Sequence, residues 1–291
     1  MHIKKSIFDI VSLIIFVIRM ALKEGLSDPF KSLGGKKVKP IYILANGPSL
    51  KDFLKIYDDN PSDFSDKEFF VVNDFVKDPH FKKIKPQYCA MSDPLFFIET
   101  IYTERGHKAM ESMANEVDWP MVLVVPRFYL YSPFLNPIRM NRNIKIIAFH
   151  SLRYCGPEKC RNWFYSKGLG NGEFGTVALN ALYASIQCGY KEIYLYGIDH
   201  TFFDNLAVNE KNELCFRDTH YYGTDSKLRP MLNHYNGLRF PSKPFRMSEF
   251  LFEKANLFRG HEIMNKYANY VNCKVYNCTP NSLVDEYERK G

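Results

Sequence analysis

The chain has 291 residues, of which 46% are hydrophobic, and a formal net charge of +7. This length fits one large α/β domain, or one domain with an insertion, and the apolar fraction supports a full core, which excludes a disordered chain. The charge gathers in lysine clusters at 36–39 and 82–85. Nucleic acid would suit such charge, but no recognition motif supports it, and an anionic membrane surface or sugar nucleotide is an equally good physical partner.

The cysteine pattern indicates free thiols in a reducing, cytoplasmic setting. There are seven cysteines, an odd number, and no small-residue cleavage site of a signal peptide precedes the core. Cys155 and Cys160 are five residues apart, as are Cys273 and Cys278. Neither pair has the spacing of a zinc knuckle, so we expect no metal site.

An apolar segment at 7–22 precedes the core. It contains Asp9 and Arg19 and is shorter than the ~20 apolar residues that a spanning helix needs. Lysines flank it, so the segment is expected to form a helix that lies on an anionic membrane, with residues 4–39 as the part that contacts the membrane. An ordinary helix packed on the domain or on a second subunit is the alternative. Gly25, Pro29 and Gly34 then break the chain. We therefore expect an appendage at 1–38 and a single domain at 39–291.

The core domain is predicted to alternate strands and helices. Short apolar runs predict strands at 41–45, 69–72, 87–91, 121–125, 144–149, 192–196 and 274–276. Helical patterns lie at 50–56, 95–114, 174–187, 247–271 and 281–287. This alternation predicts an α/β fold with a Rossmann-like, mostly parallel sheet flanked by helices. Lid or acceptor segments are expected near 150–172 and 200–245.

Polar residues concentrate where the predicted strands stop, which is where ligands bind in parallel sheets. These strand ends are 46–49, Asn73-Asp74, Ser92-Asp93 and 197–199. In the first, Gly47 would let the backbone approach a ligand and Ser49 could bind an oxygen, with a helix N-terminus behind it that favours phosphate. A plain strand-to-helix turn is the alternative.

Two later segments carry further candidates. The polar stretch 218–223 contains His220, a candidate general base, and Tyr221 and Tyr222, either of which could donate a hydrogen bond to a phosphate. A surface histidine is the alternative. At 278–283, Asn281 or Ser282 would stand at a helix N-terminus and hold a hydroxyl or phosphate, or serve only as an N-cap.

These segments together resemble a known enzyme family. In order, the chain carries Asn-Gly-Pro-Ser-Leu at 46–50, Asn73, Pro-Leu-Phe-Phe at 94–97, a long match at 189–199, His-Tyr at 220–221 and Pro-Asn-Ser-Leu at 280–283. The set resembles the bacterial sialyltransferases of glycosyltransferase family 42. The resemblance implies a single-domain GT-A-variant fold and an inverting, metal-independent transfer without a cofactor, from CMP-sialic acid or a related nonulosonate donor.

The resemblance also assigns roles to residues. Asn46, Ser49 and Asn73 would contact the nucleotide, and His220 would deprotonate the acceptor hydroxyl. The remaining donor-site positions implied are Gly47, Ser92, Asp93, Gly175, Thr176, Gly197, Asp199, Asn281 and Ser282.

The chain departs from the family in four respects. The family carries a Tyr shortly after its Gly-Ile-Asp segment, whereas residues 200–203 read His-Thr-Phe-Phe here, so Tyr221 or Tyr222 would take that role. Ser92-Asp93 replaces an Asn-Pro pair, and Gly175-Thr176 substitutes for a Ser-Gly segment. The family's membrane attachment is C-terminal, whereas the apolar segment here is N-terminal.

The expected function is therefore sialyl transfer to a glycan acceptor in bacterial surface polysaccharide or lipooligosaccharide synthesis. The enzyme would lie in the cytoplasm, peripherally on the inner face of the cell membrane. The sequence leaves open whether the chain forms a homo-oligomer. Two alternatives remain. One is a Mg²⁺-dependent pyrophosphokinase or flagellin-modification relative with the same strand ends, and the other is a non-catalytic nucleotide-sugar-binding protein.

Overall fold

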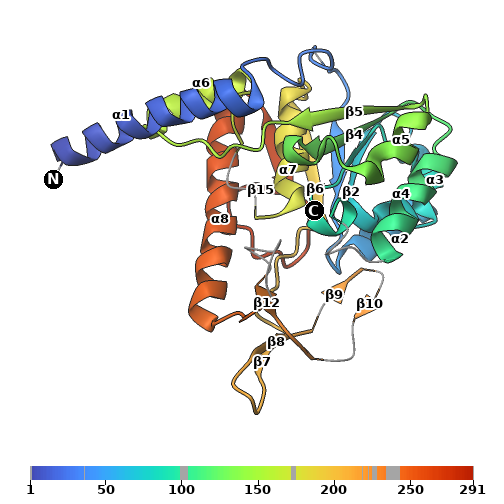
Figure 1. Cartoon of the computed structure of the whole chain (residues 1–291). Helices are drawn as coiled ribbons and strands as arrows, with labels where there is room; N and C mark the ends of the chain where they lie inside the picture. The colour runs from blue at the N-terminus through green and yellow to red at the C-terminus, as the bar shows by residue number, and fades with distance from the viewer. Residues whose placement is uncertain are drawn as a thin grey trace.

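The computed structural model describes residues 2–35, 37–98, 104–171, 175–217, 219–221, 223–224, 228–233 and 243–290. Its centre is an eight-stranded sheet with the order β15-β14-β6-β1-β2-β3-β4-β5 (Figure 1). Every neighbouring pair in this sheet is parallel. The strands are β1 (Ile41–Leu44), β2 (Glu68–Val72), β3 (Tyr88–Ala90), β4 (Met121–Pro126), β5 (Ile144–Phe149), β6 (Glu192–Tyr196), β14 (Lys274–Asn277) and β15 (Glu288–Arg289).

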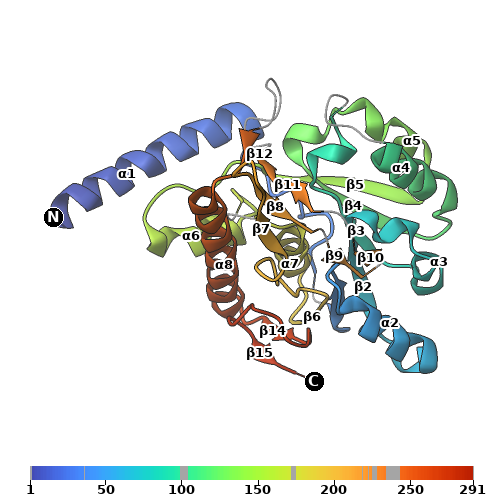
Figure 2. The same ribbon diagram turned by 90° about the horizontal axis from the view of Figure 1, so that it is seen from below.

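Helices cover both faces of this sheet, and the predicted fold class is confirmed (Figure 2). On one face the core includes residues of α7 (Val177–Gln187) and α8 (Met247–Tyr270). The other core includes residues of α2 (Leu50–Asp59), α3 (His80–Ile84), α4 (Glu104–Glu116) and α5 (Asn136–Met140). Because both faces are covered, the strands are apolar almost throughout, which is why short apolar runs located them in the sequence.

The order of strands creates a crossover point. After β1, the chain builds β2 to β5 outward along one half of the sheet and then returns through α7 to place β6 on the other side of β1. The loops after β1 and β6 therefore leave in opposite directions. A crevice forms at the carboxyl ends of such a strand pair, and ligands of doubly wound sheets bind there.

Two predicted helices differ from the structure. The segment 95–114 contains only a 3₁₀ turn at Pro94–Phe96 before α4, and residues 99–103 lie outside the described part. The helix expected at 281–287 is wrong. Asn281 has a left-handed φ of 54°, and the Arg289 guanidinium donates to the carbonyls of Thr279, Ser282 and Val284. Side chains satisfy this backbone, so the segment runs as a turn into β15.

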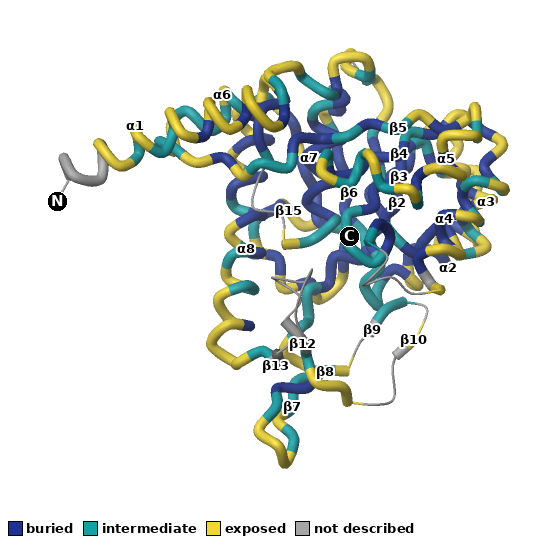
Figure 3. Tube along the Cα trace, viewed as in Figure 1, coloured by how far each residue is buried: buried dark blue, intermediate teal, exposed yellow. Residues whose placement is uncertain are grey.

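The N-terminal segment forms α1 (His2–Arg19), which continues as a π-helical turn at Met20–Glu24. Figures 1 and 3 show its N-terminal half extending from the body. Phe16 and Met20 are buried, and the Phe16 ring meets the rings of Tyr154 and Phe164 edge-on, at 5.2 and 5.5 Å. The other side of the helix exposes Ile7, Phe8, Ile10, Val11, Ile14, Ile15, Val17 and Ile18. No helix within the described ranges combines the length and apolarity needed to cross a membrane.

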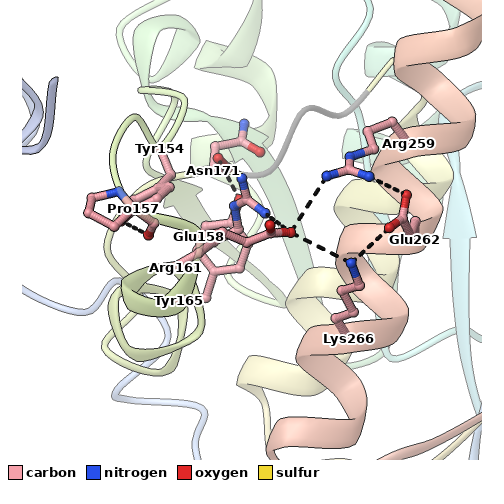
Figure 4. Close-up of polar contacts among 9 residues, drawn as sticks. All are labelled: Tyr154, Pro157, Glu158, Arg161, Tyr165, Asn171, Arg259, Glu262 and Lys266. Carbon is pink, nitrogen blue, oxygen red and sulfur yellow. Dashed lines mark hydrogen bonds and ion pairs between the residues drawn. The ribbon is translucent and has the colours of Figure 1, made fainter. Parts of the chain in front are cut away.

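The segment at 150–171, where a lid or acceptor segment is expected, packs against α8. It contains α6 (Glu158–Ser166), and Glu158 lies 3.5 Å from Arg259 and 3.6 Å from Lys266 of α8 (Figure 4). Within the segment, the Tyr165 hydroxyl donates to the Asn171 carbonyl at 3.2 Å. The two ion pairs of Glu158 join the segment to α8.

Short antiparallel strands build the region after β6 in the part of the chain that is described there. β8 (Leu214–Phe216) pairs with β7 (Leu206–Val208) and β11 (Arg229–Pro230). Two further pairs are β9 (Thr219–His220) with β10 (Gly223–Thr224), and β12 (Leu232–Asn233) with β13 (Lys243–Pro244). This excursion lies on the side of the sheet where β1 and β6 end (Figure 1).

Candidate functional site

A cavity of about 740 Å³ opens at the carboxyl ends of β1, β2 and β6, at the crossover point. The N-terminus of α7, the first half of α8 and the excursion after β6 complete its walls. It brings together nine of the sequence-predicted residues: Asn46, Gly47, Asn73, Asp93, Gly175, Thr176, Gly197, Asp199 and His220. Five others do not line it: Ser49, Ser92, Tyr221, Asn281 and Ser282. Tyr222 lies outside the described residues.

The loop after β1 is held tightly against the end of β6. The Gly47 N–H donates to the Gly197 carbonyl at 2.9 Å, and the Ser49 hydroxyl and N–H donate to the two carboxylate oxygens of Asp199 at 2.9 and 3.1 Å. Burial raises the pKa of Asp199, and the hydrogen bonds from Ser49 oppose that shift. Ser49 therefore anchors the loop, whereas Asn46 and Gly47 face the cavity.

Two asparagine side chains from neighbouring strand ends border the cavity. Asn46 Nδ2 donates to the Val72 carbonyl at 3.1 Å, and Asn73 follows β2 with a left-handed φ of 46°, a conformation that asparagine tolerates. Within the described part of the chain, Oδ1 of both residues is buried without a hydrogen-bond partner. Buried polar atoms are nearly always paired, so these two oxygens are suited to accept hydrogen bonds from a ligand.

The N-terminus of α7 forms the opposite wall. Thr176 caps the helix by accepting a hydrogen bond from the Ala178 N–H at 3.4 Å, and Gly175 precedes it. A Cβ at Gly175 would lie 3.2 Å from Leu257 Cβ, so glycine permits the close approach of α8. The first N–H groups of a helix and its dipole favour an anion. Behind this wall, Asn180 donates to the Ser92 hydroxyl at 2.8 Å, so Ser92 ties β3 to α7.

His220 reaches the cavity because β9 docks on the loop after β1. The Tyr221 N–H donates to the Asn46 carbonyl at 3.3 Å, and His220 Nδ1 lies 3.4 Å from the same oxygen. A carbonyl only accepts, so this contact requires the proton on Nδ1 and leaves the lone pair of the neutral ring on Nε2. That is the form a general base needs. The Tyr221 ring lies 6.1 Å from Phe75 in the core instead.

The 280–282 segment supports the site from behind. Ser282 is buried and donates to the Ile198 carbonyl at 2.6 Å, while the Leu283 N–H donates to the Asp199 carbonyl at 3.0 Å. Because no helix follows Ser282 in the described residues, the predicted position at a helix N-terminus is wrong. Ser282 holds the strand end 197–199 in place.

Several residues of the cavity were missed by sequence reasoning. His200 lines it, and its Nε2 lies 3.0 Å from His261 Nε2, while His261 Nδ1 lies 3.0 Å from the Tyr287 hydroxyl. Lys254 of α8 also lines it. No periodic pattern in the sequence marks these residues as neighbours. The one signal for them was that His200 follows a strand end, where the family that the chain resembles carries a Tyr shortly afterwards.

Metal ligands do not gather in the described ranges, where no group of three or more His, Cys, Asp or Glu is placed to hold an ion. All seven cysteines are free.

The fold and cavity together define an α/β protein with a ligand pocket at the crossover of a doubly wound sheet. No protein-family model matches the chain, and no curated protein matches it. Among solved structures it is similar to the MAf glycosyltransferase from Magnetospirillum magneticum AMB-1, with 13% identity and a TM-score of 0.48. The match covers 88% of this chain and 34% of the other, so the chain spans about a third of that protein's length.

Proposed function

We propose that this protein is a glycosyltransferase that moves a sugar from a nucleotide-sugar donor to a hydroxyl of a glycan acceptor. The observation that carries the proposal is the meeting of three features in one cavity: the amide oxygens of Asn46 and Asn73, the N-terminus of α7, and His220. The amides offer acceptors for a nucleoside, the helix end suits a phosphate, and the imidazole suits proton transfer.

The donor we propose is CMP-sialic acid or a related CMP-nonulosonate. The cytosine amino group and the ribose hydroxyls are hydrogen-bond donors, which is what two orphaned amide oxygens require. The resemblance of the chain to family 42 sialyltransferases supports the same donor. A volume of about 740 Å³ accommodates a sugar nucleotide together with part of an acceptor.

In the proposed reaction, Nε2 of His220 takes the proton of the acceptor hydroxyl. The hydroxyl oxygen then bonds to the anomeric carbon while the bond from that carbon to the phosphate oxygen breaks, and CMP leaves with the electron pair. One displacement inverts the anomeric centre. The transfer is proposed to need no metal, because N–H groups of the protein can stabilise the leaving phosphate.

We further propose that α1 holds the enzyme on the cytoplasmic, anionic face of a bacterial membrane, where surface glycans are built. The helix exposes apolar side chains along the face directed away from the domain. Lysines follow within the 4–39 segment. Apolar area and positive charge are the two terms that bind an interfacial helix to anionic lipid.

A thermal-shift panel tests the donor. CMP, CMP-sialic acid, UDP, GDP and ADP are added to the purified protein, and the midpoint of unfolding is measured, since a ligand of the folded state raises it. We expect CMP and CMP-sialic acid to raise the midpoint most. A preference for ADP, together with activity that requires Mg²⁺ and ATP and stops in EDTA, would replace this proposal with a pyrophosphokinase.

A further inference from the structure

The α8 side of the cavity carries a cation, Lys254, next to Glu253 in the chain. Its ammonium group forms no ion pair with a carboxylate in the described part of the chain. The ammonium instead lies 4.0 Å from the ring centre of Phe202 and 5.2 Å from that of Phe250. Burial lowers the pKa of Lys254, while the charge of Glu253 raises it. A partly desolvated charge of this kind attracts an anion strongly because little water screens it.

His200 stands beside the same aromatic ring. Its imidazole stacks on Phe202 with the ring centres 5.1 Å apart, and a left-handed φ of 54° turns it out of the strand end. Burial is the main cause that lowers the pKa of His200 to about 3, and the charge of Lys254 adds to it. His200 is therefore neutral at physiological pH, so one of its two ring nitrogens carries a proton and the other accepts.

Which nitrogen of His200 carries that proton depends on the contacts behind it, through the tautomer of His261. The Tyr287 hydroxyl lies 3.0 Å from His261 Nδ1 and 3.4 Å from the His261 carbonyl. When it donates through the shorter contact, to Nδ1, the proton of neutral His261 is on Nε2, which then donates to His200 Nε2. The proton of His200 is left on Nδ1, which has no hydrogen-bond partner among the described residues. Tyr287 and His261 are both buried, so water does not compete for these bonds.

The acids around the cavity are mostly engaged elsewhere. Asp199 binds Ser49, Asp74 pairs with Lys77 at 2.6 Å, and Asp93 accepts from the Leu95 N–H at 3.0 Å. Glu253 also lines the cavity, and burial raises its pKa. The wall formed by α8 and residues 200–202 therefore presents the ammonium of Lys254 and the Nδ1–H of His200, beside the carboxyl group of Glu253.

We propose that His200 and Lys254 form a subsite for a phosphate group, with His261 and Tyr287 as positioning residues that present Nδ1–H of His200. The subsite deepens the proposed function, because the phosphate it takes is that of the nucleotide-sugar donor. An ammonium and a neutral N–H together stabilise the charge that grows on the leaving phosphate.

Calorimetric titration of CMP and cytidine into Lys254→Met tests the subsite. The affinity for CMP is expected to fall about tenfold to hundredfold, the range for a lost hydrogen bond to a charged group, while the affinity for cytidine stays unchanged. Lys266→Met is the matched control, since Lys266 is on the same helix, exposed, and outside the cavity. Equal CMP affinity in Lys254→Met and the wild type would overturn the subsite and leave the proposed function standing.

A second pair of variants tests the role of His200. His200→Asn keeps an N–H donor near the place of Nδ1 and is expected to retain CMP affinity, whereas His200→Phe keeps the ring and is expected to lose it. Cytidine binding shows that each variant has a folded cavity. His200→Phe with full CMP affinity would remove His200 from the subsite.

Inorganic phosphate separates this proposal from the proposed function. It is expected to raise the unfolding midpoint of the wild type and of Lys266→Met but not that of Lys254→Met. If phosphate stabilises in this pattern while no nucleotide binds, the subsite stands and the nucleotide-sugar proposal falls. If Lys254→Met changes neither the stabilisation by phosphate nor the affinity for CMP, the proposed subsite is wrong.

Discussion

Ser49 and Asp199, 150 residues apart in the chain, are joined by two hydrogen bonds, from the Ser49 hydroxyl at 2.9 Å and from its N–H at 3.1 Å. The pair closes the loop after β1 onto the end of β6 and so fixes where Asn46 and Gly47 stand. The carboxylate carries both bonds from a buried position, where its charge is costly.

Asp199→Asn is expected to change how stability depends on pH. The raised pKa means that the folded state binds more protons than the unfolded state between the ordinary value of 3.8 and the raised one. The contribution of Asp199 to the free energy of unfolding is therefore largest below that window and falls as pH rises through it. Urea unfolding of both proteins from pH 4 to 7 measures this. A wild-type minus variant difference that rises with pH would contradict it.

Gly47→Ala is expected to lower the free energy of unfolding by about 1–3 kcal/mol, the cost of overpacking, and to abolish nucleotide binding. A Cβ there would overlap the Asp199 carboxylate and lie 2.5 Å from the Gly197 carbonyl oxygen. Gly34→Ala is the control, since its Cβ would meet nothing closer than 3.7 Å and is expected to change stability by about 0.5 kcal/mol at most. Similar unfolding curves for the two variants would contradict the prediction, because they would show that the loop moves to accommodate the added Cβ at little cost in stability.

His220→Ala is expected to lower the rate of sugar transfer about 10²- to 10⁴-fold, the usual contribution of a general base, with CMP affinity unchanged. Its Nδ1 lies on the Asn46 carbonyl, so the ring is placed by the nucleotide loop without being needed to close it. Single-turnover transfer and CMP titration measure the two effects separately. Full activity in the variant would remove His220 from the base role.

The buried pair His200 and His261 is expected to make the protein sensitive to acid. Burial lowers the pKa of both, to about 3 for His200, so the unfolded state binds more protons than the folded state below the ordinary pKa of 6.5. Stability is fully present above pH 6.5 and falls as pH drops, by up to about 1.4 kcal/mol per pH unit for each histidine. His261→Phe should flatten the curve between pH 6.5 and 4.5. An unchanged slope in this variant would argue against a neutral pair.

The double variant Ile14→Asn/Ile18→Asn is expected to lower the fraction of protein that sediments with phosphatidylglycerol vesicles. Both side chains lie on the exposed side of α1 and are 54% and 52% exposed. Ile56→Asn is the matched control, because Ile56 is 55% exposed on α2. If the double variant instead turns a dimer into a monomer and sediments with vesicles as before, a second copy of the chain covers this face.

The strands were predictable because a parallel strand buried on both faces is a short apolar run, and β5 falls on its predicted bounds of 144–149. The absence of a helix at 281–287 was not predictable. The polar, turn-forming residues at its start also suit a helix N-cap, and only the tertiary structure shows that Arg289 satisfies the carbonyls of this segment. His261 and Tyr287 could not be linked to His200 either. Their contacts span 61 and 26 residues, and nothing local in the sequence reports them.

By itself the sequence determined the class of fold and the strand ends where polar residues gather, because a buried strand and the polar residues that follow it are contiguous in the chain. The division of labour among those residues was decided only by tertiary structure. Ser49 anchors, Asn46 faces the cavity and Ser282 supports from behind, because each role depends on a hydrogen-bond partner that folding brings from a distant part of the chain. Lys254 borders the cavity for the same reason: the packing of α8 against the N-terminus of α7 decides which side of the helix meets it.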